Sequence, residues 1–152
     1  MPEMKDAPIA QPPSPSNPLE GGCLCGEVRF RVTAPFVASG YCHCTRCQRR
    51  TGTASSVSAR VPREGFELLQ GAEHVRAFRP PTGGKAKVFC SNCGSALCSG
   101  ELDSDELIAI RLGALDSDPG IRPHYRQFVD WAASWEPIPD DGLMRHAGER
   151  GG

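Results

Sequence analysis

Three cysteines within six residues are the most informative chemical feature of this chain. Cys42, Cys44 and Cys47 form a CxCxxC cluster in the stretch Cys-His-Cys-Thr-Arg-Cys. Thiolate sulfur is a soft donor that suits zinc. A structural zinc usually takes four protein ligands, whereas a catalytic zinc keeps one position for water or substrate. The cluster therefore predicts a zinc centre with three protein ligands and one open position.

The other five cysteines decide how this cluster is interpreted. Cys23 and Cys25 form a CxC pair, Cys90 and Cys93 form a CxxC pair, and Cys98 stands alone. Together the two pairs supply the four thiolates of a closed structural zinc site. A glycine follows the second cysteine of each pair, as in zinc knuckles, where it lets backbone N–H groups turn toward sulfur. The pattern predicts two zinc ions per chain.

Two alternatives stay open on the cysteines alone. The eight cysteines could form four disulfides in a secreted protein, although the close CxC and CxCxxC spacings suit tetrahedral metal better. Cys98 could complete the three-cysteine cluster and close both centres, although its strand-like surroundings favour a buried apolar role.

Composition indicates one domain that benefits from metal. The chain has 152 residues, of which 39% are hydrophobic and only 7% aromatic, so it can bury one modest core. Glycine and proline number 17 and 14, which predicts short strands and many turns. We expect metal binding to be coupled to folding.

Charge and hydropathy restrict the partners. The 17 basic and 18 acidic side chains give a formal net charge of −1, so no general attraction for nucleic acid or anionic lipid is expected. No run approaches the roughly 18 consecutive apolar residues of a membrane-spanning helix, and the N-terminus has no apolar signal core. We expect a cytoplasmic protein that binds neither nucleic acid nor membrane. The sequence does not set its oligomeric state.

The chain is expected to consist of one domain with two loose ends. Residues 1–18 contain six prolines and few apolar side chains, so burial cannot offset the roughly 1–2 kcal/mol per residue that ordering a backbone costs. We predict a disordered proline-rich tail over residues 1–18, a single zinc-binding domain over residues 19–146, and a loose C-terminus over residues 147–152.

Alternating side chains predict a mainly β domain of antiparallel sheets. Charged and apolar residues alternate over residues 27–32, which is typical of a half-buried strand whose Val28, Phe30 and Val32 face the core. A short helix is expected over residues 45–51, beginning inside the cysteine cluster and ending before a glycine. Further strands are expected at residues 55–61, 66–69, 74–78, 87–89, 96–98 and 107–112.

In their order and spacing, these motifs resemble the glutathione-dependent formaldehyde-activating enzyme family, also called the centromere protein V family. The resemblance is carried by residues 21–26 (GGCLCG), 42–52 (CHCTRCQRRTG) and 89–95 (FCSNCGS). It continues through residues 112–116, 122–124, Trp135 and 140–143, so it covers nearly all of residues 19–145.

The resemblance implies an Mss4-like fold of stacked antiparallel sheets with two zinc sites of different character. The structural zinc would be held by Cys23, Cys25, Cys90 and Cys93. The zinc assigned to chemistry would be held by Cys42, Cys44 and Cys47. The activity implied is that of a carbon–sulfur lyase, which reversibly joins glutathione and formaldehyde to S-hydroxymethylglutathione.

Three arginines near the open site are candidates for substrate binding. Arg46, Arg49 and Arg50 lie beside or just after the cluster, and guanidinium groups suit carboxylates such as the two of glutathione. They could instead be solvated charges on a short helix. Two further functions also stay open: a thiol-binding module without turnover, for glutathione or a similar thiol, and a zinc-scaffolded interaction domain.

Overall fold

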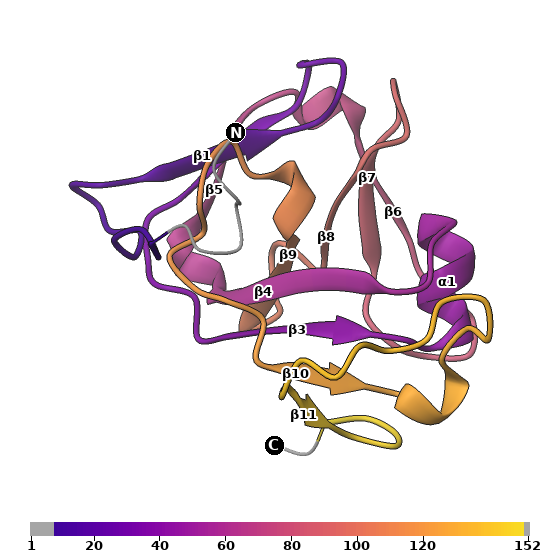
Figure 1. Ribbon diagram of the computed structural model, residues 1–152. Helices are drawn as coiled ribbons and strands as arrows, with labels where there is room; N and C mark the ends of the chain where they lie inside the picture. The colour runs from indigo at the N-terminus through magenta and orange to yellow at the C-terminus, as the bar shows by residue number, and fades with distance from the viewer. Residues whose placement is uncertain (1–7, 151–152) are drawn as a thin grey trace.

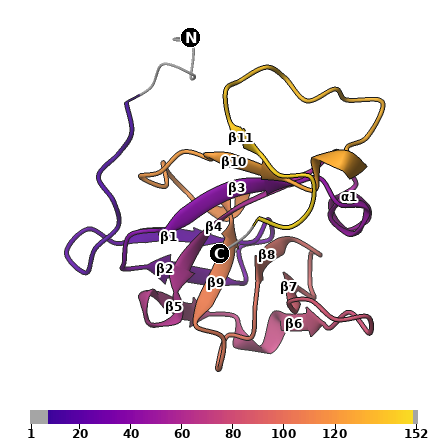
Figure 2. The same cartoon turned by 90° about the horizontal axis from the view of Figure 1, so that it is seen from below.

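The computed structural model describes residues 8–150, which form a mainly β protein with one α-helix (Figures 1 and 2). The helix is α1 (Thr45–Thr51), so none of the described residues forms a helix long and apolar enough to cross a membrane. The strands are β1 (Leu19–Gly22), β2 (Arg29–Val32), β3 (Ala38–Cys42), β4 (Ser56–Pro62), β5 (Phe66–Gln70), β6 (Val75–Phe78), β7 (Lys87–Cys90), β8 (Ala96–Ser99), β9 (Leu107–Arg111), β10 (Tyr125–Gln127) and β11 (Met144–Arg145). Single 3₁₀ turns lie at Arg63–Gly65, Ala72–His74, Leu112–Ala114 and Val129–Trp131.

The strands form two sheets. A three-stranded sheet has the order β1-β2-β5, and an eight-stranded sheet has the order β11-β10-β3-β4-β9-β8-β7-β6. The larger sheet folds over, so that β6 and β7 run across the direction of β3 and β4 (Figure 1). The predicted mainly β architecture of antiparallel sheets is confirmed. One addition is that β10 pairs in parallel with both β3 and β11.

The core lies between the two sheets and is built as the alternation predicted. Val28, Phe30 and Val32 are almost completely buried, and Ile108 and Ile110 of β9 are buried with them. Each such side chain contributes about 1.5–3 kcal/mol of apolar burial. The core therefore fixes the small sheet against the large one, and with it the turns that follow β1 and β7.

Most predicted elements are confirmed, with shifts of one or two residues at their ends. The helix occupies Thr45–Thr51 as expected. The strand expected over residues 27–32 begins only at Arg29, because Glu27 and Val28 belong to the turn around the CxC pair. His74, expected in a strand, ends a 3₁₀ turn instead.

Four strands carry no periodic signal and were not predicted. β1 contains Gly21 and Gly22, β3 is rich in small residues, and β10 and β11 have only three and two residues. Their positions are set by pairing partners rather than by their own side chains. β3 pairs along its whole length with β4 and brings Cys42 opposite Ser56.

The segments outside the predicted domain make more contacts than free ends would. Ser14 and Asn17 close a turn through two backbone hydrogen bonds, and the N–H of Ala10 donates to Asp118 Oδ1 at 3.3 Å. At the other end, the N–H of Arg150 donates to Gln127 Oε1 at 2.9 Å. Residues 1–7 and 151–152 of the two predicted loose ends lie outside the described part, and the division into tail, domain and C-terminus stays a prediction.

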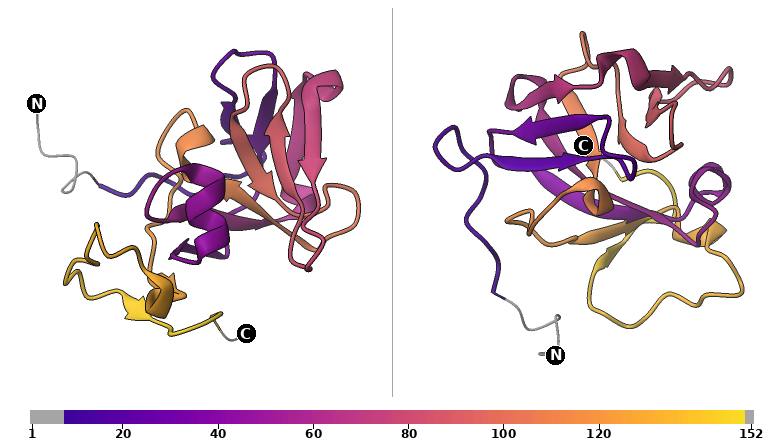
Figure 3. Two further views of the ribbon diagram at one scale, coloured as in Figure 1. Left: turned by 90° about the vertical axis from the view of Figure 1, so that its right-hand side faces the viewer. Right: turned by 90° about the horizontal axis from the view of Figure 1, so that it is seen from above.

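Helix α1 is held on two sides. It lies between the β6–β7 hairpin and the C-terminal segment (Figure 3). On one side the guanidinium of Arg46 donates to the carbonyl oxygen of Gly83 in the loop between β6 and β7. On the other side the side-chain amide of Gln48 donates to the carbonyl oxygen of Trp131 at 2.9 Å. The helix is therefore positioned by contacts from distant parts of the chain.

The close approach of β10 to β3 gives a testable prediction about stability. A Cβ at Gly40 would overlap the ring of Tyr125, which packs directly on this glycine. Gly40→Ala should therefore lower the free energy of unfolding by about 1–3 kcal/mol, as overpacking typically does. Chemical denaturation measures the change. Gly113→Ala is the control, since a Cβ there meets no atom within 4 Å; equal stability of the two variants would contradict the prediction.

Candidate metal centres and ligand pocket

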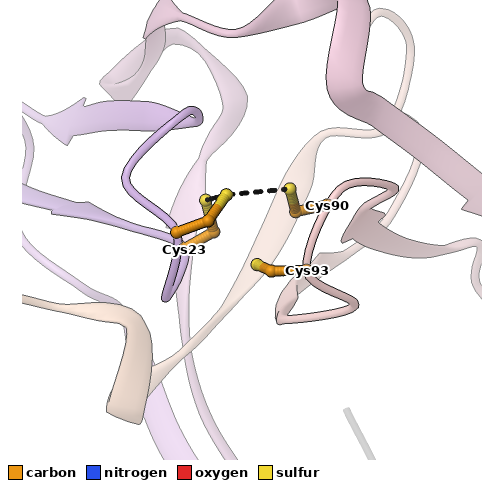
Figure 4. A group of neighbouring side chains, drawn as sticks. Cys23, Cys90 and Cys93 are labelled. Carbon is orange, nitrogen blue, oxygen red and sulfur yellow. Dashed lines mark hydrogen bonds between the residues drawn. The ribbon is translucent and has the colours of Figure 1, made fainter.

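The CxC and CxxC pairs come together although they are distant in sequence. Cys23 follows β1, and Cys90 is the last residue of β7. The sulfur atoms of Cys23, Cys90 and Cys93 face one another in Figure 4, and those of all four cysteines lie within 4.8 Å of one another. Cys25 Sγ is 3.5 Å from Cys23 Sγ and 3.9 Å from Cys90 Sγ. Sulfurs bound tetrahedrally at about 2.3 Å from zinc stand about 3.8 Å apart, so this set suits zinc.

Each pair is closed by a tight turn ending in glycine. Gly26 and Gly94 have φ of 82° and 79°, and their N–H groups donate to the carbonyl oxygens of Cys23 and Cys90. This left-handed backbone is the conformation that glycine adopts most readily. The N–H of Val28 also donates to Cys23 Sγ at 3.3 Å. The turns therefore resemble zinc knuckles, in which backbone donors stabilise thiolate charge.

Without a cation, these four thiols cannot all be ionised. Hydrogen bonds from Ser95 lower the pKa of Cys93 to about 5. Burial raises the pKa of Cys90, whose side chain has no exposed surface, to about 11. Thiols this close therefore ionise in sequence, and a bound cation would let all four become thiolates.

The three-cysteine cluster is built locally, where β3 meets α1. Cys42 ends β3, Cys44 is the residue before the helix, and Cys47 lies in its first turn. The sulfur of Cys44 accepts from the N–H of Cys47 at 3.3 Å and so caps the helix. The three sulfurs lie within 4.8 Å of one another, so this cluster also has the arrangement of a metal site.

In the three-cysteine cluster, too, ionisation of one thiol opposes ionisation of its neighbour. The hydrogen bond between Cys42 and Cys47 is the main cause that lowers the pKa of Cys47 to about 4 and raises the pKa of Cys42 far above its ordinary value. One thiolate thus forms easily, at the expense of its neighbour. A cation bound among the three sulfurs would remove this conflict.

His43 lies between two of these cysteines but belongs to a different network. Its buried ring accepts at Nε2 from Arg126 Nη1 at 3.1 Å. Arg126 also donates to Asp141 at 2.8 and 3.2 Å and lies over the ring of Tyr41 at 4.1 Å. Burial, followed by the charge of Arg126, lowers the pKa of His43, so the imidazole stays neutral. His43 thus connects the cluster to the C-terminal segment and is absent from both sulfur sets.

Cys98 belongs to neither set of cysteines among the described residues. It lies in β8 opposite Ile110, is 2% exposed, and has a pKa raised to about 12 by burial. Its surroundings are those of a small apolar core residue, in line with the interpretation preferred from its sequence context.

The three candidate arginines all line one pocket of about 500 Å³ beside α1. Arg46, Arg49 and Arg50 form its helix side, and Lys87 and Phe89 of β7 lie among the residues facing them. Volumes of this size are typical of small-molecule sites. The pocket thus adjoins the helix whose first turn carries the three-cysteine cluster.

Several polar residues near this site carry no signal in the sequence that would assign them a role. Lys87 was expected only as part of a strand, and neither Arg111 nor Arg126 was assigned a role. Arg111 lies in β9, on the side opposite to the buried Ile110. Alternation places it on the sheet face that does not point into the core, but nothing in the sequence shows which helix covers that face.

The comparisons with known proteins agree with this geometry. The chain matches the family model described as glutathione-dependent formaldehyde-activating enzyme over residues 18–131. It is 32% identical over 105 residues to a Halomonas elongata protein named "Putative glutathione-dependent formaldehyde-activating enzyme", covering 66% of this chain and 67% of that protein. A crystal structure of a Rhodobacter sphaeroides protein, a structural genomics target, superposes with a TM-score of 0.54 at 21% identity, over 84% of this chain and 98% of that one, and shares the fold. The chain therefore belongs to the glutathione-dependent formaldehyde-activating enzyme family.

Proposed function

We propose that this protein is a zinc-dependent carbon–sulfur lyase that joins glutathione and formaldehyde to S-hydroxymethylglutathione. The observation that carries the proposal is that a three-sulfur cluster lies at the start of α1 while arginines of the same helix line a pocket. Family membership supports the same conclusion. A four-sulfur set elsewhere in the fold leaves this cluster as the one with a ligand position to spare.

The proposal assigns one zinc to each set of cysteines. Cys23, Cys25, Cys90 and Cys93 would hold a structural zinc, and their spacing suits tetrahedral sulfur coordination. Cys42, Cys44 and Cys47 would hold a second zinc with an open position. A zinc ion there would lower the pKa of a thiol in its fourth position, so that thiolate forms near neutral pH.

The reaction itself balances simply. The glutathione thiol gives up its proton, and its sulfur forms a bond to the carbon of formaldehyde. The carbon–oxygen π bond breaks as this bond forms, and the oxygen that receives its electron pair takes up a proton. The thiolate is the nucleophile in this step. Within the chain, the buried His43 is kept neutral by burial and by Arg126, so we assign it no charge in the reaction.

We assign the glutathione carboxylates to the arginines of α1. Arg46, Arg49 and Arg50 line the pocket, and guanidinium groups bind carboxylates through paired, charge-assisted hydrogen bonds. None of the three is paired with a carboxylate among the ion pairs of residues 8–150. Their charges are therefore available to an anionic ligand.

One property of the cluster favours a second candidate function, a thiol-binding module without turnover. Three anionic sulfurs overcompensate the charge of a dication, which weakens it as a Lewis acid. A thiolate held there would be bound firmly but would attack slowly. Glutathione that binds without faster adduct formation would distinguish this function from the lyase.

Metal content tests the assignment of the cysteines. We expect two zinc ions per chain in the wild type and in Cys98→Ser, and one in Cys90→Ser and in Cys47→Ser, by mass spectrometry of the metal. Cys90→Ser should lower the melting temperature more than Cys47→Ser, because its set joins segments distant in sequence and so constrains a longer loop of the unfolded chain. Loss of one zinc from Cys98→Ser would instead make Cys98 a ligand.

Two-dimensional exchange NMR tests the reaction. The zinc-loaded protein should speed exchange between glutathione and S-hydroxymethylglutathione, and Cys42→Ser should abolish the acceleration. Cys42 is chosen because Cys44 also caps α1. Cys98→Ser is the matched control and should keep the wild-type rate. An uncatalysed rate with the wild-type protein would rule out the lyase.

A further inference from the structure

Three cations at or next to the ligand pocket have no carboxylate to balance them. Arg50 comes from α1, Lys87 from β7 and Arg111 from β9. All three are half-buried, and we call them the half-buried cation cluster. Within residues 8–150 none of them forms an ion pair with an acidic side chain. Charges withdrawn from water are normally paired, so their arrangement calls for an explanation.

The hydrogen bonds of this cluster are short of acceptors. Nε and Nη2 of Arg50 and Nε of Arg111 are buried without a partner in the described part of the chain. The oxygen of Ser99 accepts from Lys87 Nζ at 3.3 Å and also from the guanidinium of Arg111. That oxygen then has both lone pairs engaged, and its own proton is left to donate. Hydrogen-bond donors from α1, β7 and β9 thus meet near Ser99 of β8, whose oxygen is the acceptor that Lys87 and Arg111 share.

The pKa shifts of Lys87 and Arg111 also indicate an excess of positive charge at this place. Burial lowers the pKa of Lys87, and the charge of Arg111 lowers it further. Burial and then the charge of Arg50 lower the pKa of Arg111 to about 10, whereas the thiolate of Cys47 acts in the opposite direction. Three thiolates around one dication carry a single net negative charge, which cannot balance three cations. An anionic group bound at the pocket would offset the positive charge that remains.

The pocket gives such an anion access. Arg50 and Lys87 both line it, together with the apolar side chains of Phe78 and Val88. Arg111 lies behind Lys87, on the far side of their shared partner Ser99. An anionic group entering the pocket would therefore contact Arg50 and Lys87 directly and feel the charge of Arg111 at longer range.

We propose that the half-buried cation cluster is a carboxylate subsite that makes the protein select anionic thiols over neutral and cationic ones. In this arrangement Arg50 and Lys87 bind the carboxylate and Arg111 is a positioning residue that acts through Ser99. The inference rests on the proposed function for the place of the ligand sulfur, at Cys42, Cys44 and Cys47. It assigns to Lys87 and Arg111 a part in specificity that lies outside the three arginines of α1.

Binding of S-methylglutathione to the zinc-loaded protein tests the subsite, because its capped sulfur cannot form a thiolate and its carboxylates remain. Lys87→Met, which keeps an unbranched apolar chain, should raise the dissociation constant roughly tenfold or more, as loss of a charge-assisted hydrogen bond does. Lys87→Arg should keep most of the affinity. Arg31→Met is the control, since Arg31 lies in β2 and pairs with Glu67 away from the pocket. Unchanged affinity in Lys87→Met, or no binding to the wild type, overturns the proposal.

Thermal stability separates a binding role from a structural one. Removal of a half-buried charge without an ion-pair partner should leave the melting temperature of the ligand-free Lys87→Met and Arg111→Met variants unchanged or raised. Weaker binding in a protein of equal or higher stability is the expected combination. A lowered melting temperature with unchanged affinity would show that these cations only support the fold, and would overturn the proposal.

Selectivity is measured with three thiols that share an HS–CH2–CH2– unit and end in a carboxylate, a hydroxyl or an ammonium group. The wild type should bind 3-mercaptopropionate more tightly than 2-mercaptoethanol, and cysteamine most weakly. Arg111→Met should flatten this order, and an unchanged order would overturn the proposal. These binding results are independent of turnover. Charge-selective binding without accelerated exchange by NMR would refute the lyase and keep the subsite. Accelerated exchange with no charge preference would keep the lyase and refute the subsite.

Discussion

Crowded thiols that cannot ionise together are the constraint on which the rest of this structure depends. In the four-sulfur set, hydrogen bonds from Ser95 lower the pKa of Cys93, while burial raises the pKa of Cys90. In the three-sulfur set, the hydrogen bond between Cys42 and Cys47 lowers the pKa of Cys47 and raises the pKa of Cys42. A divalent cation resolves the conflict by stabilising every thiolate in the set at once. Assembly of the fold and ionisation of the cysteines are thus aspects of one equilibrium.

The two sets differ in what they connect. The four-sulfur set joins the turn after β1 to the turn at the end of β7, so it links the small sheet to the large one. The three-sulfur set spans only the junction between β3 and α1. A metal clip over a long loop contributes more to stability than one over a short loop. With metal bound to both sets, the fold would therefore rely mainly on the first set, which would leave the second free to serve binding.

The sequence was most informative where local chemistry decides the structure. The glycine turns that close each cysteine pair, the three-cysteine cluster and the extent of α1 were all predicted from residues close together in the sequence. β3 and β10 were missed because their small or few side chains have no periodicity, and their pairing decides their course. Arg111 was missed for a related reason. Its proposed role depends on Ser99, Lys87 and Arg50, which come from other strands and the helix, and no local pattern records that proximity.

Cys44 is both a member of the three-sulfur cluster and the cap of α1, and this double role makes the helix sensitive to oxidants. A sulfur converted to a disulfide or a sulfenic acid loses the thiolate character that a ligand needs. The same event alters the group that accepts from the N–H of Cys47. Because Arg46, Arg49 and Arg50 lie in this helix, oxidation at one atom would disturb both the metal-binding set and the cationic wall of the pocket. The reduced form of Cys44 is thus the one that can serve the cluster and the helix together.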